Sequence, residues 1–202
     1  MSPRPYTLGK REAAVDKTRT RVLEAARQLL AGEKQTDLSM EAIARRADVS
    51  RLTLYYQFNS RAGLLEALYD YLAMRGNMRR MAEVFHEPDP WKGLENLVRI
   101  FIAFWSSDPV VIRRLRSMAA LDPEIGKGIQ ARDARRLHAA REIVRRVDNL
   151  KTKRTTSRVD HRADVLSLLT SFETYDALAR AGHTEEEILE TIRSLGRFVC
   201  RV

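Results

Sequence analysis

The sequence lacks the cysteine pairs, long apolar runs and secretory leader on which several classes of protein depend. Its single cysteine, Cys200, cannot form an internal disulfide, which favours a reducing compartment, so we expect a cytoplasmic protein. No apolar run approaches the roughly 18 residues of a membrane span, so we expect no membrane partner. The first seven residues contain two prolines and no apolar core, so we expect no secretory signal.

Motifs of catalysis and metal binding are also missing. Neither a glycine-rich phosphate loop nor a nucleophile elbow occurs. The four histidines are scattered, and His161 with Asp160 and Asp164 lacks the further ligands that a metal site needs. Cys200 lies in an apolar stripe, which is typical of a small core residue. We therefore predict that the protein is not an enzyme and holds no metal and no cofactor.

Positive charge is present in excess and is unevenly distributed. The net charge is +9. Residues 1–80 hold 15 Lys and Arg against 9 Asp and Glu, whereas residues 81–202 hold 21 against 18. The excess in the smaller part favours a polyanion partner there. Charge that serves solubility alone is the alternative.

Residues 39–58 predict two short helices joined by a tight turn. Ser39 can cap the first helix, because its hydroxyl can accept from a backbone N–H of the first turn. One apolar helical stripe follows, made of Met40, Ile43, Ala44 and Ala47. The stripe ends at Asp48, and Ser50 can cap a second helix, with the apolar Val49 filling the gap between the two.

The second helix, from Arg51 to Phe58, has a buried side and an outward side. Leu54 and Phe58 are four residues apart and form the buried side. At about 100° per residue, the outward side carries Leu52, Thr53, Tyr56 and Gln57. Thr and Gln can bond to base edges in a DNA major groove, and Leu can touch a thymine methyl. Arg51 and Tyr55 flank this side and are placed for phosphates.

These residues resemble the TetR family of bacterial transcriptional regulators. The resemblance covers residues 16–76 and rests on A-x-x-A-D-V-S-x-x-T-L-Y-Y-x-F, followed by Ser60-Arg61 and an apolar helix. An earlier apolar stripe of Val22, Ala26, Leu29 and Leu30 agrees with it. The family commonly has Gly where Asp48 stands, in a conformation that Asp tolerates. It often has Gly or Pro at Leu52, and an acidic residue at Gly63, where the capping box is therefore half missing.

The resemblance implies an all-α protein with a helix-turn-helix DNA-binding domain followed by a helical ligand-binding and dimerisation domain. We expect a flexible basic arm over residues 1–15, the DNA-binding domain over 16–76 with its helix-turn-helix at 39–58, and the second domain over 77–202. The arm either tracks DNA or is an inert tail. The predicted DNA-contacting residues are Ser39, Arg51, Leu52, Thr53, Tyr55, Tyr56, Gln57, Ser60 and Arg61.

Nine helices and no strand are expected. The first runs over 16–31, with Lys17, Arg19 and Thr20 within reach of a phosphate. The fourth runs from the Ser60 cap toward residue 85. Asp-Pro pairs at 89–90, 108–109 and 122–123 predict helices over 90–106, 109–119 and 123–150, because Asp caps and Pro suits the first helical position. A charged loop at 151–158 precedes a helix to residue 181, and Thr184 opens the last helix with a capping box.

The second domain is expected to hold a ligand pocket and a dimer face. Aromatic and Met side chains can line an apolar cavity or simply fill a core. The predicted pocket residues are Trp91, Phe101, Phe104, Trp105, Met118 and Phe172. The predicted interface residues are Leu166, Leu169, Ile188, Ile192, Leu195, Gly196 and Val199. The resemblance implies that the last two helices build a two-fold four-helix bundle, and that a small effector binds in the cavity.

The favoured hypothesis is a homodimeric repressor that binds a palindromic operator in double-stranded DNA and is released by a small hydrophobic or amphipathic effector. Two alternatives stay open: an all-α enzyme or carrier with no DNA role, and a helical interaction scaffold. A run of arginines from Arg132 to Arg146 has acidic neighbours, so we interpret it as a solvated, partly paired face rather than a second nucleic-acid site.

Overall fold

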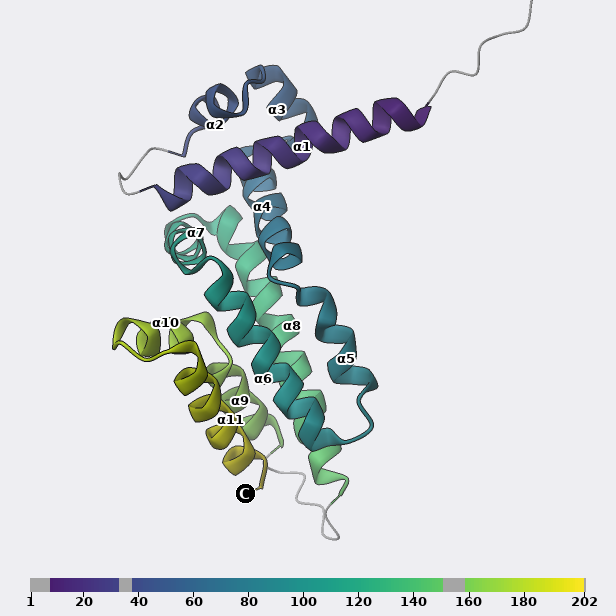
Figure 1. The fold of residues 1–202 in the computed structure, drawn as a ribbon, viewed down its shortest axis with the longest axis vertical. Coiled ribbons are helices and arrows are strands. Elements are labelled where there is room, and N and C mark those ends of the chain that lie inside the picture. The colour runs from purple at the N-terminus through teal and green to yellow at the C-terminus, as the bar shows by residue number, and fades with distance from the viewer. Residues whose placement is uncertain (1–7, 33–37, 151–158, 202) are drawn as a thin grey trace, which may run out of the picture. The chain divides into compact units, whose positions relative to one another are not determined.

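The computed structural model describes residues 8–32, 38–150 and 159–201, and gives side chains from residue 15 onward. Within these residues the chain forms eleven α-helices, one 3-10 helix and no strand, so the all-α prediction is confirmed (Figure 1). The chain divides into two compact units, Met1–Tyr71 and Leu72–Val202. None of the described helices is apolar enough over a sufficient length to cross a membrane.

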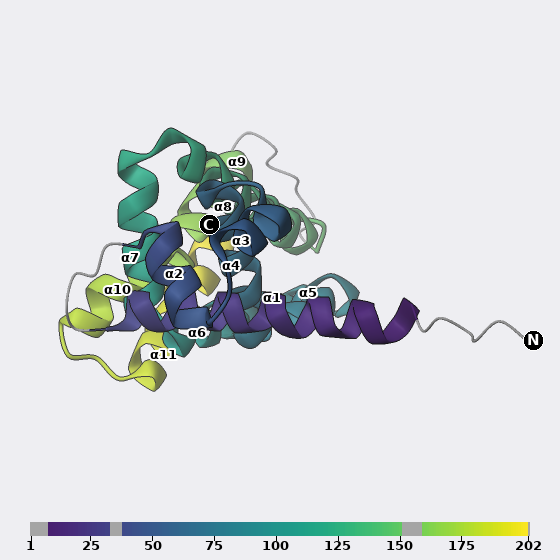
Figure 2. The same ribbon diagram turned by 90° about the horizontal axis from the view of Figure 1, so that it is seen from above.

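The first unit contains α1 (Leu8–Ala31), α2 (Met40–Ala47), α3 (Arg51–Phe58) and most of α4 (Arg61–Arg75). In both ribbon views α2 and α3 are two short helices beside the long α1 (Figure 1 and Figure 2). Their packed faces supply a core that includes Val22, Ala26, Ile43, Leu54, Leu64 and Leu68. The helix α1 begins at Leu8 and not at residue 16, so the predicted arm was wrong over residues 8–15. The rest of the predicted arm lies outside the described residues.

The helix α4 stops ten residues before the predicted end. A Cβ atom on Gly76 would lie 2.5 Å from a ring carbon of Phe104, so the chain passes too close to that ring for a side chain. Asn77 then takes a left-handed conformation with φ of 60°, which ends the regular helix. A short 3-10 helix, η1 (Met78–Arg80), and α5 (Met81–His86) follow.

The second unit is built around α6 (Pro90–Ser107), which contacts α5, α7 (Pro109–Leu121), α8 (Pro123–Asp148), α10 and α11. All three helices predicted from Asp-Pro pairs begin at the proline. The Asp89 carboxylate accepts from the backbone N–H of Trp91 at 2.9 Å, and that of Asp122 accepts from Glu124 at 3.0 Å. A cap and a preset proline φ therefore start α6 and α8 together, whereas the Asp108 side chain makes no cap hydrogen bond at the start of α7.

The predicted helix ending at residue 181 is two helices, α9 (Val159–Leu169) and α10 (Phe172–Arg180). Ser171 separates them, because its hydroxyl accepts from the backbone N–H of Thr174 at 3.2 Å and caps α10. The indole N–H of Trp105 donates to the Thr170 carbonyl at 3.0 Å and so satisfies a backbone group that the break exposes. The predicted loop at 151–158 lies outside the described residues.

The last helix, α11 (Glu185–Arg201), opens with the capping box that the sequence predicts. The backbone N–H of Thr184 donates to the Glu187 carboxylate at 2.8 Å, and the backbone N–H of Glu187 donates to the Thr184 hydroxyl at 3.3 Å. This confirms the boundary between α10 and α11.

The arginine run on α8 is partly structural, contrary to the expectation of a solvated face. Arg136 is buried and donates to the Ser167 carbonyl at 3.2 Å. Arg146 donates to the Val84 carbonyl at 3.0 Å and to that of Glu87, which ties α8 to α5. These guanidinium groups donate to backbone carbonyls of neighbouring helices, so they stabilise packing.

Candidate nucleic-acid interface

The turn between α2 and α3 has the geometry predicted for a helix-turn-helix. The Ser39 hydroxyl accepts from the Ala42 N–H at 3.2 Å, and the Ser50 hydroxyl accepts from the Thr53 N–H at 3.0 Å. Asp48 ends α2 in a left-handed conformation with φ of 50°. The two caps and the positive φ are therefore confirmed.

The helix α3 has the two sides that its spacing predicts. Leu54 and Phe58 are 0% and 5% exposed and anchor the helix to the core of the first unit. Leu52 and Tyr56 are 79% and 84% exposed on the outward side. These two large side chains project from one short capped helix and lie one turn apart on the same side.

The polar members of the predicted reading face are less accessible than the apolar ones. Thr53 is half-buried, and its hydroxyl lies 2.8 Å from that of Ser50, so it is already part of the cap. Gln57 is half-buried too, and its amide oxygen is buried without a hydrogen-bond partner. Arg51 and Tyr55 are exposed beside the face, as expected for phosphate contacts.

At the start of α4, Ser60 acts as the predicted cap, since its hydroxyl accepts from the Gly63 N–H at 3.0 Å. A Cβ atom on Gly63 would lie 2.2 Å from the Phe58 carbonyl oxygen, so this close turn excludes the acidic residue that is usual there. Arg61 is half-buried and donates through Nε to the Leu38 carbonyl at 3.2 Å. Its role as a phosphate ligand, predicted from position alone, therefore competes with a structural one.

Two arginines of α1 were not predicted to support the reading helix. Arg19 donates to the Gln57 carbonyl at 3.1 Å, and its guanidinium carbon lies 4.5 Å from the centre of the Phe58 ring. Arg21 donates to the Asp48 carbonyl at 3.4 Å. The sequence had placed Arg19 within reach of a phosphate. In the structure Arg19 instead holds the C-terminal end of α3. No local spacing reveals these contacts, because they join residues 27 and 38 positions apart.

Glu24 links α1 to α4 within the first unit. Its carboxylate accepts from the Tyr71 hydroxyl at 3.0 Å, from Arg27 at 2.8 Å and from Gln28 at 3.1 Å. The hydrogen bonds from Arg27 are the main reason that the pKa of Glu24 falls to about 2, against a smaller opposing effect of burial. This link fixes α4 to α1, the helix that also holds α3 through Arg19.

Four of the six predicted pocket residues form one aromatic cluster in the described structure. Phe101, Phe104, Trp105 and Phe172 are buried and contact one another ring to ring, with centroids 4.6–5.9 Å apart. Met118 is half-buried on α7, and Trp91 lies at the start of α6 beneath the Arg201 guanidinium. These aromatic rings fill a core in the described structure, so the ligand pocket stays a prediction.

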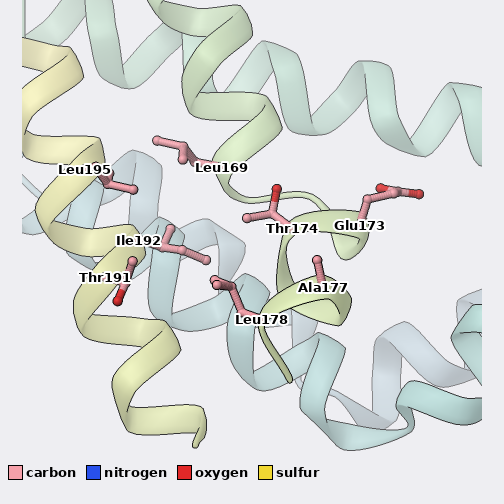
Figure 3. Close-up of a pocket in the computed structure, with 8 residues that line it drawn as sticks. All are labelled: Leu169, Glu173, Thr174, Ala177, Leu178, Thr191, Ile192 and Leu195. Carbon is pink, nitrogen blue, oxygen red and sulfur yellow. The ribbon is translucent and has the colours of Figure 1, made fainter. Parts of the chain in front are cut away.

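A shallow apolar groove of about 420 Å³ lies instead between α10 and α11 (Figure 3). Its walls are Leu169, Glu173, Thr174, Ala177, Leu178, Thr191, Ile192 and Leu195. None of the predicted pocket residues lines it, but three predicted interface residues do. Beside it, Leu168 and Phe198 are 62% and 66% exposed.

Four of the seven predicted dimer-interface residues are buried within their own chain, so the prediction is wrong for these four. Leu166, Ile188, Ile192 and Gly196 are buried in their own chain, because α11 lays this stripe on α6 and α9. A Cβ atom on Gly196 would lie 3.4 Å from Leu166 and 3.6 Å from Leu94. Leu169 and Val199 are half-buried and Leu195 is 46% exposed. Only these three of the seven residues offer surface to a partner.

The fold and the interface together define an all-α protein whose smaller unit is a helix-turn-helix with a capped, outward-facing second helix. The model of the bacterial regulatory proteins of the tetR family matches residues 22–68, which contain both helices of the motif. Over these residues the chain is similar to this family.

Individual relatives agree with this assignment. The chain is 29% identical over 119 residues to the HTH-type transcriptional regulator EthR of Mycolicibacterium smegmatis. That alignment covers 57% of this chain and 55% of EthR, so the chain spans about half the length of the curated relative it matches.

Solved structures share the fold over almost the whole chain. A TetR transcription regulator from Haloarcula marismortui has a TM-score of 0.72 and 18% identity, with 92% of this chain and 97% of that one covered. A protein of Saccharomonospora viridis, described as a transcriptional regulator and solved in complex with choline, has a TM-score of 0.68 and 18% identity, with 89% and 95% covered.

Proposed function

We propose that the protein is a homodimeric, DNA-binding transcriptional regulator that represses from a palindromic operator and is released by a small hydrophobic or amphipathic effector. The observation that carries the DNA-binding part is the outward side of α3. Two large side chains, Leu52 and Tyr56, project from a helix that is capped at Ser50 and anchored at Leu54 and Phe58. A second helix held in this way is the element that helix-turn-helix proteins place in the major groove.

The effector part of the proposal has independent support. The structural relative from Saccharomonospora viridis was solved in complex with choline, a small organic cation. In this chain α4 is continuous across the division between the two units, at Tyr71 and Leu72. An effector that displaces the last turn of α4, which belongs to the second unit, therefore also displaces the rest of this helix, and with it α3 of each protomer. DNA presents half-sites at a fixed repeat, so such a displacement weakens binding to one of them.

DNA binding is tested with a duplex that the full-length protein enriches from a randomised double-stranded library. Affinity for this duplex is measured over a range of salt concentrations. We expect log affinity to fall linearly with log salt, because phosphate contacts release counterions. An all-α enzyme or carrier without a DNA role enriches no duplex, and that result would refute the proposal.

The reading face is tested by Tyr56→Ala in the same assay. Loss of one base contact from each half-site is expected to reduce affinity at least about tenfold. Phe85→Ala on α5 is the matched control, because Phe85 is also an exposed aromatic residue, at 43%, and it lies in the other unit. Equal affinity for Tyr56→Ala and wild type would remove α3 from the interface.

A further inference from the structure

The outward side of α3 carries an exposed apolar residue, Leu52, close to the start of the helix. Leu52 is the second residue of the helix and is 79% exposed. In a helix-turn-helix the N-terminal residues of the second helix contact base edges. A leucine at this position has no hydrogen-bonding group, so whatever it recognises on a base is apolar.

The polar residues that share this side are already engaged or half-buried. Thr53 lies in the Ser50 cap, and the amide oxygen of Gln57 is buried. On the neighbouring helices, Arg61 donates to the Leu38 carbonyl, and Arg19 donates to the Gln57 carbonyl at the C-terminal end of α3. In the first turn of α3, Leu52 therefore offers an apolar surface beside the exposed Arg51, with Tyr56 one turn further along the same side.

The major groove contains one apolar group on its base edges, the C5 methyl of thymine. We propose that Leu52 is a specificity-determining residue that packs against a thymine methyl in each half-site of the operator. This inference rests on the proposed function, and it adds the base that this residue selects. A thymine is preferred there over uracil, which presents the same hydrogen-bonding groups without the methyl.

The test uses the duplex that the full-length protein enriches from the randomised library. Each thymine of the half-sites is replaced in turn by deoxyuridine, symmetrically in both halves, and affinity is measured for wild type and Leu52→Ala. Burial of one methyl corresponds to about a fourfold change in affinity, and two half-sites to about fifteenfold. We expect a loss of this size at one thymine position for wild type, and less than about a twofold loss for Leu52→Ala.

Leu121→Ala is the matched control, because Leu121 is an exposed leucine, at 88%, in the other unit. It should show the same preference for thymine as wild type. Leu52 makes little packing contact, so Leu52→Ala is expected to fold, and unfolding by urea verifies this before binding is measured.

The outcomes separate the inference from the proposed function. If a duplex is enriched but deoxyuridine is tolerated at every position, or if Leu52→Ala keeps the full preference for thymine, the inference is overturned and DNA binding stands. If the enriched half-site contains no thymine, the inference is overturned in the same way. If no duplex is enriched at all, both the inference and the proposed function fail.

Discussion

Single residues decide how the chain turns from one helix of the interface to the next. Asp48 adopts a φ of 50° between α2 and α3, a conformation that costs most residues with a Cβ atom roughly 1–2 kcal/mol. Gly63 stands where any side chain would meet the Phe58 carbonyl. Asp48 thus tolerates a left-handed backbone, whereas the close approach at Gly63 requires the absence of a side chain.

Glu24 is the residue whose charge is most strongly coupled to the fold of the first unit. Its pKa falls from an ordinary 4.5 to about 2, chiefly through hydrogen bonds from Arg27. A lowered carboxyl pKa contributes stability that is fully present above pH 4.5 and is lost as the pH falls toward 2. Because the Glu24 side chain is 29% exposed, solvent reduces this contribution to about 1 kcal/mol.

We expect Glu24→Gln to lower the free energy of unfolding by about 1 kcal/mol at pH 7, with a difference from wild type that narrows between pH 4.5 and pH 3. Urea unfolding at several pH values measures it. Glu41→Gln, which alters an exposed carboxyl on α2, serves as the control and should track wild type. A Glu24→Gln deficit that stays constant down to pH 3 would mean that the carboxylate charge does not stabilise the unit.

Between elements, the tightest polar link in the described structure joins α8 to α9. Arg162 and Asp148 form an ion pair with side chains only 7% and 11% exposed. Arg162 also donates to the Cys200 carbonyl at 3.4 Å, which includes α11 in the link. Removing one partner deprives the other buried charge of its ion-pair partner, at a cost of about 3–5 kcal/mol.

We therefore expect Arg162→Leu to destabilise the protein by about 3–5 kcal/mol, measured by urea unfolding. The double variant Arg162→Leu with Asp148→Leu should recover most of the loss, because it removes both charges and keeps apolar volume. An exposed pair provides the control: Arg193→Leu, beside Glu190 on α11, should cost less than about 1 kcal/mol. No recovery in the double variant would show that packing of the arginine, and not its charge, is what matters.

Helix boundaries with a local signal were predictable from the sequence, whereas the start of α1 and the end of α4 were not. A start depends on local chemistry, such as Asp122 followed by Pro123, and the structure has it where the sequence placed it. The end of α4 depends on Phe104, 28 positions beyond Gly76 in the chain, so periodicity alone could not reveal it. The break at Ser171 did leave a local signal, a serine three residues before Thr174, which an apolar helical pattern concealed.

For the whole molecule, the sequence predicted which side chains are buried on α3, but it did not predict which neighbour buries the apolar stripe of α11. Leu54 and Leu52 of α3 lie on the sides that their spacing predicts. On α11 the cleanest apolar stripe, containing Ile188 and Ile192, was assigned to a partner chain but is buried in its own. An apolar stripe indicates that one face of a helix is buried, but it does not indicate what buries it. The packing of α11 on α6 and α9 shows that this face is covered by its own chain.

We propose that a second protomer binds at the groove between α10 and α11 and at Leu168, Leu195 and Phe198, which are 62%, 46% and 66% exposed. Exposed apolar residues around an apolar groove favour self-association, and a palindromic operator requires two protomers. We expect Phe198→Glu to shift the protein from dimer to monomer in sedimentation velocity and to weaken binding to the enriched duplex by at least about 100-fold, since one half-site is then bound alone.

Leu121→Glu introduces the same charge at a residue that is 88% exposed on α7, away from the groove, and should remain dimeric with unchanged affinity. Phe198 contributes little to the core of its own chain, so both variants should unfold at the same urea concentration as wild type. A Phe198→Glu protein that stays dimeric would place the interface elsewhere. A Phe198→Glu protein that becomes monomeric but keeps full affinity would show that one α3 helix suffices for binding. That result would refute the proposal that two protomers bind two half-sites of the operator.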